Sequence, residues 1–331
     1  MRAREKPPDF PADRTTLMVR PSVERRHETM YGRIKAFAVG LRQWAGSTIS
    51  GGPAQRAFAR RQLHWRTKGL FQREATFQRN GFTWTGSTSC SITELIFTTD
   101  HYQDDRLEQV TSWLATQGRF SRPVLVNVGA NLGDIVLPLS RTGKRILAVE
   151  PNPETFARLV RNVRQNGLQD RITCCDVAIS DAPGTARLVS AGDPGNSELD
   201  TGGSRLGFEG QDYTRAVHEV RTLPLTDLLA SQKIALGDVA LVISDTQGFE
   251  TQVIESGAAL WREKTPLWVE IWPKGLACHG GVEAFLRSCE RHFTHFVPET
   301  GIGAPPEPVR NLSALVGRLK SAEFTDVLLI S

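Results

Sequence analysis

An apolar run leads directly into a glycine-rich turn at residues 124–134, VLVNVGANLGD. Five residues made mostly of valine and leucine predict a strand buried on both faces of a sheet. Glycine lets the following backbone turn tightly and approach a ligand, and a helix that starts there offers free N–H groups. A strand, glycine turn and helix in this order indicate the first unit of a doubly wound α/β fold, where nucleotides bind.

Strand and helix patterns alternate after this turn. Further strands are expected at residues 145–149, 171–175, 239–244, 267–271 and 324–330, and helices at 133–141, 153–165, 225–230, 247–257 and 282–291. This alternation predicts a Rossmann-like, mostly parallel sheet with helices on both faces. Residues 181–222 break the rhythm with glycine, proline and charged residues, so we expect an insertion with two short antiparallel strands, 186–189 and 217–222.

The part of the chain before this domain has a different composition. The first 80 residues contain 17 Lys and Arg against 6 Asp and Glu, whereas the remaining residues contain 23 against 30. Residues 1–27 are polar and lack a periodic pattern, which predicts a disordered tail. Residues 28–121 are expected to form a basic, mainly helical extension that caps the α/β domain of residues 122–331.

Residues 28–45 place apolar side chains on one helical face with basic residues between them. Three roles are open for this segment: packing on the α/β domain, mediating a homodimer, or lying on an anionic membrane surface as a peripheral contact. The whole chain has a net charge of only +4, which does not indicate nucleic acid as a partner.

Other features bear on the compartment. No run of about 18 apolar residues exists to cross a bilayer, and the first residues lack the apolar stretch of a secretory signal. The five cysteines are odd in number and have no CxxC spacing, which argues against a disulfide framework and a zinc site. These observations predict a cytoplasmic protein.

The glycine turn and the end of the next strand provide candidate ligand contacts. Gly129, Asn131 and Gly133 do not have the GxGxxG spacing of a dinucleotide site, so the turn better suits a smaller ligand with an amino-acid end. Glu150 follows about 20 residues later, where a carboxylate accepts hydrogen bonds from both ribose hydroxyls. The alternatives are a tight turn without a ligand and a solvated strand end. Asn152 is a candidate N-cap of the following helix.

The end of the third strand borders the place of an adenine ring in this topology. Asp176, or the backbone near Val177 and Ala178, is a candidate to hydrogen-bond the exocyclic amine of the ring. A turn-starting aspartate is an equally good interpretation of Asp176.

The best candidate for catalysis is Asp245, which follows a buried strand and precedes a glycine. A carboxylate there orients or deprotonates an acceptor hydroxyl, with Glu270 at the end of the next strand as a second candidate. Two alternatives remain: Asp245 caps the helix that follows, or it binds Mg²⁺ together with Glu270. Glu250 fits a helix-dipole partner better than a catalyst, and we assign no metal ligand.

The motifs together resemble the FkbM family of methyltransferases. The segments that carry the resemblance lie in residues 124–271 and read VGANLGD, AVEPNPETFARLVRNVRQNGL, AISD, LPLTDLL, LVISDTQGFETQVIESGA and PLWVEIW. The resemblance implies a class I methyltransferase fold with S-adenosylmethionine as cofactor. Residues Gly129, Asn131 and Gly133 would meet its methionine end, Glu150 its ribose, and residues 176–178 its adenine.

Two positions depart from the family pattern. The family usually has Asp where Asn127 stands, just before the glycine turn, and Lys where Ser244 stands, before Asp245. Both changes remove a charge near the methionine end, where Asn127 is assigned to the cofactor site.

The resemblance implies methyl transfer to a hydroxyl of a saccharide or secondary metabolite. Alternatives are an N-methyltransferase for a small molecule, an NAD-dependent oxidoreductase of the same fold, and a degenerate binder without activity. The absence of GxGxxG argues against the oxidoreductase, and the lack of a target-base motif argues against a nucleic-acid methyltransferase.

Overall fold

The computed structural model describes residues 52–100, 104–190, 197–199, 216–320 and 323–331. The predicted tail of residues 1–27 and the amphipathic segment of residues 28–45 lie outside these ranges. The gaps at residues 191–196 and 200–215 fall within the predicted insertion.

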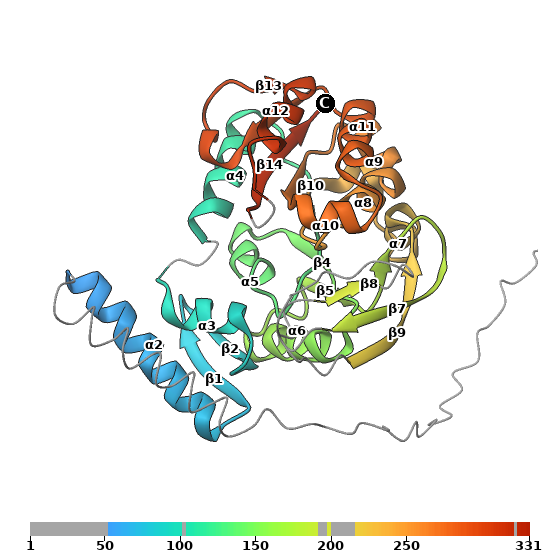
Figure 1. Ribbon diagram of the computed structural model, residues 1–331. Helices are drawn as coiled ribbons and strands as arrows, with labels where there is room; N and C mark the ends of the chain where they lie inside the picture. Colours follow the sequence, from blue (N-terminus) through green and yellow to red (C-terminus); the bar gives the residue numbers. More distant parts are fainter. Residues whose placement is uncertain (1–51, 101–103, 191–196, 200–215, 321–322) are drawn as a thin grey trace, which may run out of the picture.

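An eight-stranded sheet forms the centre of the molecule (Figure 1), in the order β13-β12-β14-β11-β10-β3-β4-β5. Five neighbouring strands are parallel, as the alternation predicted: β3 (Val124–Val128), β4 (Arg145–Val149), β5 (Ile172–Cys175), β10 (Val239–Ser244) and β11 (Leu267–Ile271). The remaining three continue the sheet beyond β11 with antiparallel pairing: β14 (Thr325–Ile330), β12 (His295–Pro298) and β13 (Glu307–Pro308). The predicted Rossmann-like class is confirmed.

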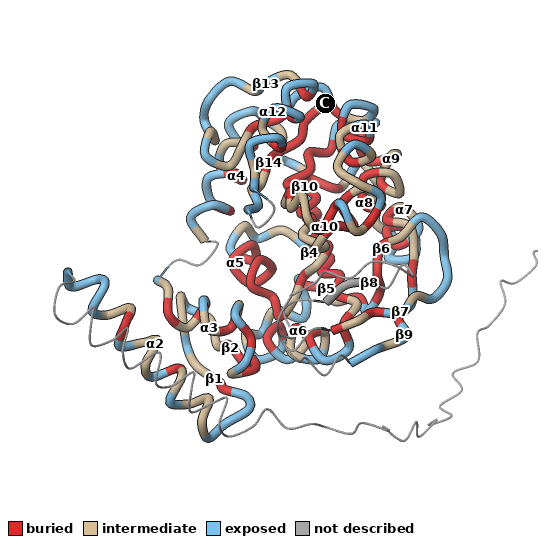
Figure 2. The backbone as a smooth tube through the Cα atoms, in the orientation of Figure 1, coloured by how far each residue is buried: buried red, intermediate tan, exposed pale blue. Residues whose placement is uncertain are grey.

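Both faces of the sheet are covered, so its central strands are buried along their whole length (Figure 2). Alternate residues of β3 enter two separate cores: Val126 contributes to one and Leu125 to the other. The first core is closed by α7 (Leu225–Ser231), α8 (Glu250–Ser256), α9 (Ala258–Arg262), α10 (Pro273–Cys278), α11 (Val282–His292) and α12 (Leu312–Val316). The second is closed by α4 (Asp104–Thr116), α5 (Val136–Leu139) and α6 (Pro153–Gln165).

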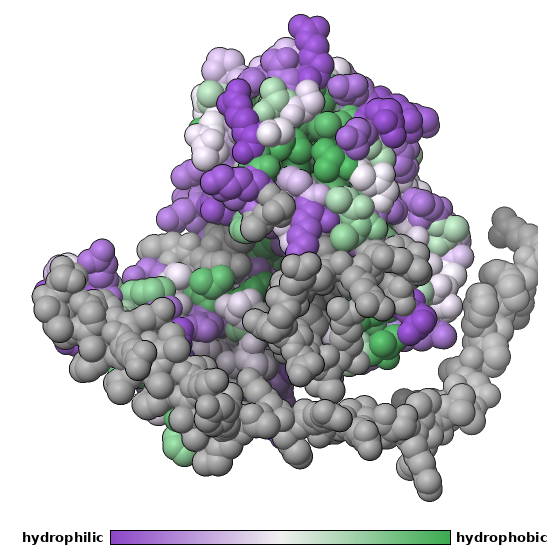
Figure 3. Space-filling view, viewed as in Figure 1, coloured by the Kyte–Doolittle hydropathy of each residue, from purple (hydrophilic) through white to green (hydrophobic). Residues whose placement is uncertain are grey.

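The surface of this body is mainly hydrophilic on the face drawn in Figure 3, where a smaller group of apolar residues lies in a recess between polar ones. Among the described residues, the large apolar side chains that remain exposed are Phe71, Leu95, Val217 and Phe324. They are scattered along the chain, so most apolar surface is in the two cores.

Two helices begin later than the sequence patterns predicted. The helix expected at residues 133–141 is only α5, followed by a 3₁₀ turn at Ser140–Thr142. The helix expected at 247–257 begins at Glu250, because Gln247 and Gly248 have φ of +56° and +114°, values that a right-handed helix excludes. In both places the chain forms an irregular turn at the carboxyl end of a strand.

The predicted insertion forms a second, smaller sheet. Its strands have the order β6-β9-β7-β8. The antiparallel pair expected there is β7 (Gly184–Ser190) with β9 (Ala216–Leu223), joined by β6 (Ala178–Ile179) and β8 (Ser197–Leu199). Since β6 follows β5 closely, this sheet lies beside the carboxyl end of the main one.

The described N-terminal extension contains helices α2 (Pro53–Phe71) and α3 (Ser91–Thr98) and a hairpin of β1 (Glu74–Arg79) and β2 (Phe82–Ser87). The helical expectation for this region missed the hairpin. Its signal is the Asn80-Gly81 pair, whose φ angles of +50° and +79° are typical of a two-residue hairpin turn. Trp65 of α2 is buried against Phe77 of β1 and Phe97 of α3.

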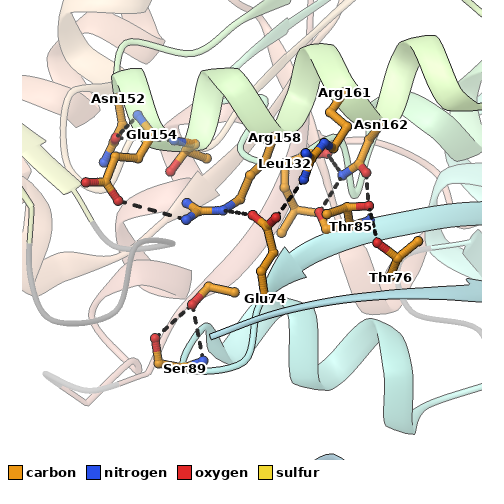
Figure 4. Close-up of polar contacts among 12 residues, drawn as sticks. Glu74, Thr76, Thr85, Ser89, Leu132, Asn152, Glu154, Arg158, Arg161 and Asn162 are labelled. Atoms are coloured by element: carbon orange, nitrogen blue, oxygen red, sulfur yellow. Dashed lines mark hydrogen bonds and ion pairs between the residues drawn. The ribbon is translucent and has the colours of Figure 1, made fainter. Parts of the chain in front are cut away.

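Helix α6 fastens this hairpin to the α/β domain with side chains that bind backbone groups (Figure 4). Asn162, which has no exposed surface, accepts from Thr85 N at 2.7 Å and donates to Thr85 O at 3.1 Å. Its amide also donates to Leu132 O in the glycine-rich turn at 2.8 Å. At the exposed edge, Arg161 forms an ion pair with Glu74 at 2.6 Å. One asparagine thus links the hairpin to the turn after β3.

Replacing Asn162 with leucine is expected to lower the free energy of unfolding by about 2–4 kcal/mol, because buried groups of Thr85 and Leu132 lose their partner. Arg161→Ala is the matched control on the same helix and should cost less than about 1 kcal/mol, as exposed ion pairs do. Urea unfolding followed by circular dichroism measures both values. Equal losses in the two variants would contradict the role given to Asn162.

Candidate functional site

A cavity of about 750 Å³, including its open mouth, lies across the carboxyl ends of β5, β4, β3 and β10. The chain continues from β3 to β4 on one side and later enters β10 on the other, so this is the point where the strand order reverses. Doubly wound folds bind their ligands at such a point. The cavity is lined by Ile92, Val128, Gly129, Asn131, Val149, Glu150, Pro151, Thr155, Val177, Ala178, Ile179, Leu188, Asp245, Thr246, Gln247 and Phe249.

Gly129 makes the junction of β3 and β10 sterically feasible. Its φ is +82°, and a Cβ atom built there would lie 1.8 Å from the carbonyl oxygen of Asp245. A distance that short is a clash of backbone with side chain that small shifts do not relieve. The glycine therefore allows Asp245 to approach the start of the turn, and Asp245 N donates to Val128 O at 3.0 Å.

Glu150 is held in place by two backbone N–H groups. Asn131 N donates to its Oε2 at 2.9 Å, and Asn152 N donates to its Oε1 at 2.8 Å. Each carboxylate oxygen retains a lone pair for another donor. Asn131 adopts a left-handed φ of +47°, which aims its N–H at the carboxylate. Burial raises the pKa of Glu150 to about 7, and these two hydrogen bonds counteract the rise.

Asp245 and Glu270 are joined through one amide at the other end of the cavity. Gln247 Nε2 donates to Asp245 Oδ1 at 2.7 Å and to Glu270 Oε2 at 3.2 Å. Burial raises the pKa of both carboxyls, and the charge of Asp245 raises that of Glu270 further. Ionisation of both carboxyls of this pair at once is therefore disfavoured.

Three more carboxyls stand behind the cavity wall. Asp134 and Glu250 are buried, and Asp326 lies opposite Glu270 in the register of β11 and β14. Burial, and next the charge of Asp245, raises the pKa of Asp134 and Asp326 to about 7. Burial also raises that of Glu250 to about 7, although Glu250 Oε1 accepts from Thr246 N and Oγ1 at 2.9 Å.

The structure brings most of the predicted site residues to one cavity. The predicted residues that line it are Gly129, Asn131, Glu150, Val177, Ala178 and Asp245. Glu270 lies off the wall and reaches it through Gln247. Asn152 also lies off the wall and caps α6, where its Oδ1 accepts from Glu154 N and Thr155 N. Asp245 does not cap α8, whose N-cap position is Phe249.

Three further predicted residues lie outside the cavity lining. Asn127 is fully buried inside β3, with Nδ2 3.5 Å from Ile243 O and Oδ1 without a partner among the described residues. Gly133 has a φ of +102° and packs against the side chains behind the turn. Asp176 is exposed and forms an ion pair with Arg221, whose Nη2 lies 2.8 Å from its Oδ1. Of the two adenine contacts considered there, Asp176 does not line the cavity, whereas Val177 and Ala178 do.

The sequence patterns missed several wall residues. Gln247 was unassigned, although a polar residue before Gly248 at the end of a buried strand is a usable signal. Phe249, Leu188 and Thr155 reach the cavity through folding of segments far apart in sequence. Ile92 comes from α3 of the N-terminal extension, so no local pattern near the glycine turn identifies it.

The cysteine, histidine and acidic side chains and the long helices of the described part of the chain bear on metal sites, disulfides and membrane spans. Within the described ranges, no group of three or more His, Cys, Asp and Glu side chains is arranged to hold a metal ion. The five cysteines, all within those ranges, are free thiols. No helix among the described segments is long and apolar enough to cross a bilayer. His279 is buried against Phe249, and burial lowers its pKa to about 4, so it is a neutral ring.

Solved structures that are similar to this chain include three that contain SAH, MeSAdo or SAM. The N-terminal domain of human METTL16 in complex with SAH aligns over 89% of this chain and 94% of its own, with 12% identity and a TM-score of 0.41. TYW2 of P. horikoshii in complex with MeSAdo aligns over 78% and 70%, with 13% identity and a TM-score of 0.37. Magnesium protoporphyrin IX methyltransferase of Synechocystis with bound SAM aligns over 69% and 79%, with 9% identity and a TM-score of 0.35.

The sequence itself gives a more direct result. Residues 127–295, slightly more than half of the chain, match the family model of the methyltransferase FkbM domain. Among curated proteins, none matches the chain in sequence. The matched segment begins inside β3 and ends at the start of β12, so it contains most of the cavity wall.

The raised pKa values predict how stability depends on pH without a ligand. Asp134, Glu150, Glu250 and Asp326 have a pKa of about 7 in the folded protein, against about 4 in an unfolded chain. The folded state therefore binds more protons in this interval, and its stability falls as pH rises from about 4 to about 7.

Between pH 5.5 and pH 8 we expect the thermal midpoint of the ligand-free protein to fall by several degrees, since each of these groups contributes about 2 kcal/mol over this interval. Differential scanning calorimetry measures this fall. Asp134→Asn should reduce it, whereas the exposed control Asp176→Asn should leave it unchanged. A midpoint that rises up to pH 8 would show that the buried carboxyls have ordinary pKa values.

Proposed function

The chain belongs to the family of methyltransferases with an FkbM domain, and on that basis we propose that it transfers a methyl group from S-adenosylmethionine to a hydroxyl of a saccharide or secondary-metabolite acceptor. The observation that carries the proposal is the fixed carboxylate of Glu150 at the wall of the cavity. Two backbone donors orient it, and its remaining lone pairs suit the two hydroxyls of a ribose.

The order of the strands gives the orientation of an adenosine ligand. Glu150 ends β4, and apolar residues near β5 and β7 stand on one side of it, namely Val177, Ala178, Ile179 and Leu188. An adenine ring fits against such a surface. On the other side of Glu150 lie Gly129 after β3 and Asp245 after β10. The amino-acid end of the cofactor would therefore lie between Gly129 and Asp245.

When bound, S-adenosylmethionine supplies a methyl group on a positively charged sulfur, an electrophile for in-line displacement. Asp245 is the carboxylate placed to orient an acceptor hydroxyl at that end and to take its proton. Its raised pKa brings it closer to neutrality, where a carboxylate is a more effective base. Gln247 is a positioning residue, since its amide fixes Asp245 relative to Glu270.

The saccharide or metabolite acceptor follows from the family, and the cavity has features that support it. Polar groups and aromatic surface meet in the cavity wall beside Asp245, where Thr246, Gln247 and Phe249 follow it in the chain. Hydroxyl-rich ligands are bound by such combinations of hydrogen-bonding groups and ring faces. The residues of the extension that reach the cavity, such as Ile92, would limit the size of the acceptor.

Calorimetric titration with S-adenosylmethionine tests the proposal. Wild-type protein should bind with a micromolar dissociation constant, and Glu150→Ala should weaken binding by about 100-fold or more because two charge-assisted hydrogen bonds are lost. The control Glu154→Ala changes an exposed carboxylate on the first turn of α6 and should bind normally. Absence of binding by a folded wild type would reject the proposed activity.

A second arm of the same test addresses catalysis. Asp245→Asn is expected to retain the fold and to lower methyl transfer to a panel of glycan and polyketide acceptors by about 10²–10⁴-fold, the usual contribution of a general base. Unchanged turnover in Asp245→Asn would remove the carboxylate from the mechanism.

A further inference from the structure

Among the described residues that line the cavity, Glu150 and Asp245 are the ionisable ones, and none is basic. Buried carboxylates are normally paired with a cation, because an unpaired charge in a low-dielectric site is costly. The wall therefore has the composition of a site that receives positive charge from its ligand.

Further carboxyls around Asp245 add to this excess of acidic over basic side chains. Asp134, Asp245, Glu250 and Glu270 form no ion pair within the described part of the chain, and Glu250 Oε2 is buried without any hydrogen-bond partner. Arg106, which is half exposed, lies 3.5 Å from Asp326 and pairs with that carboxylate. The carboxyls nearer the cavity have no such partner among the described residues.

The strand order places this negative charge at one end of the ligand. The cavity crosses the strand ends in the order β5, β4, β3 and β10, and Asp245 follows β10. Given the orientation in the proposed function, the sulfonium and the amino group of S-adenosylmethionine lie at that end. The product, S-adenosylhomocysteine, differs in having lost the sulfonium charge.

We propose that Asp245, backed by Asp134, Glu250 and Glu270, makes the site selective for the charge of the sulfonium, so that the neutral thioether product binds more weakly than the substrate. This inference rests on the proposed function. It assigns the carboxylates a specificity role in addition to the catalytic role of Asp245.

The chemistry of the transfer conserves the charge of this pocket. The acceptor oxygen forms a bond to the methyl carbon, the carbon–sulfur bond breaks with its electron pair going to sulfur, and the hydroxyl proton passes to the carboxylate of Asp245. The positive charge on sulfur and the negative charge on the carboxylate of Asp245 are therefore lost together. The protonated pocket then suits the neutral product, and loss of that proton to solvent restores the negative charge that disfavours it.

Binding of the two ligands should consequently differ in its linkage to protons. Ionisable groups lie around Asp245 on several neighbouring elements: Asp134 after β3, Glu150 after β4, Glu250 of α8, Glu270 of β11 and Asp326 of β14. Arg106 pairs with Asp326 and Glu299, Lys274 belongs to α10, and the neutral ring of His279 packs against Phe249. Burial raises the pKa of Asp134, Glu150, Glu250 and Asp326 to about 7. A cation favours their ionised forms, so it releases protons on binding, and a neutral ligand does not.

The test is isothermal titration of the full-length protein with S-adenosylmethionine and S-adenosylhomocysteine at pH 6.5, 7.25 and 8, in two buffers of different ionisation enthalpy. We expect the substrate to bind about tenfold tighter than the product at pH 8. The ratio of affinities should increase with pH, by up to about tenfold per unit when one proton is linked. Sinefungin, in which an amine replaces the sulfonium, should follow the substrate.

Two variants make the test specific. Asp245→Asn should reduce the preference for substrate several-fold and abolish most of its pH dependence, whereas Asp176→Asn, an exposed carboxyl paired with Arg221, should preserve both. Product that binds as tightly as substrate at pH 8, with a ratio independent of pH, overturns the inference and leaves the proposed function intact. Failure of both ligands to bind rejects the proposed function itself.

Discussion

The close approach of two strand ends determines how the site is built. Gly129 lies so near the carbonyl of Asp245 that a single added carbon atom would overlap it. This contact fixes the turn after β3 against the end of β10, at the point where the strand order reverses. The same turn presents the N–H of Asn131 to Glu150, so the two ends of the cavity depend on one backbone geometry. A substitution at Gly129 would therefore disturb both ends of the cavity at once.

The second constraint is the unpaired charge that this geometry concentrates. Carboxyls from the ends of β4, β10 and β11 and from α8 are brought together without basic partners among the described residues, and burial raises the pKa of each. In the ligand-free protein this arrangement reduces stability above neutral pH. The same arrangement favours a cationic ligand and provides a base for the acceptor proton. The buried charge that destabilises the ligand-free protein therefore contributes to ligand binding and to catalysis, as is common at functional sites.

Much of this could be predicted from sequence because the strands of the sheet are apolar runs separated by clear turns. The glycine turn, Glu150 and Asp245 were identified since each follows a buried strand, and parallel strands end at the same edge. Local patterns did not give Gln247, whose left-handed backbone delays α8, or Asp134, whose neighbours are distant in sequence. Nor did they give Ile92, which reaches the cavity only because α6 holds the hairpin through Asn162.

A crystal structure of the protein with S-adenosylhomocysteine tests the account most directly. The predicted result is a ligand in the cavity across β5, β4, β3 and β10, with both ribose hydroxyls on the carboxylate of Glu150, the adenine against Val177 and Ala178, and the thioether sulfur beside Asp245. A ligand bound elsewhere, or one in the same cavity with its adenine beside Asp245, would contradict the assignment of the site.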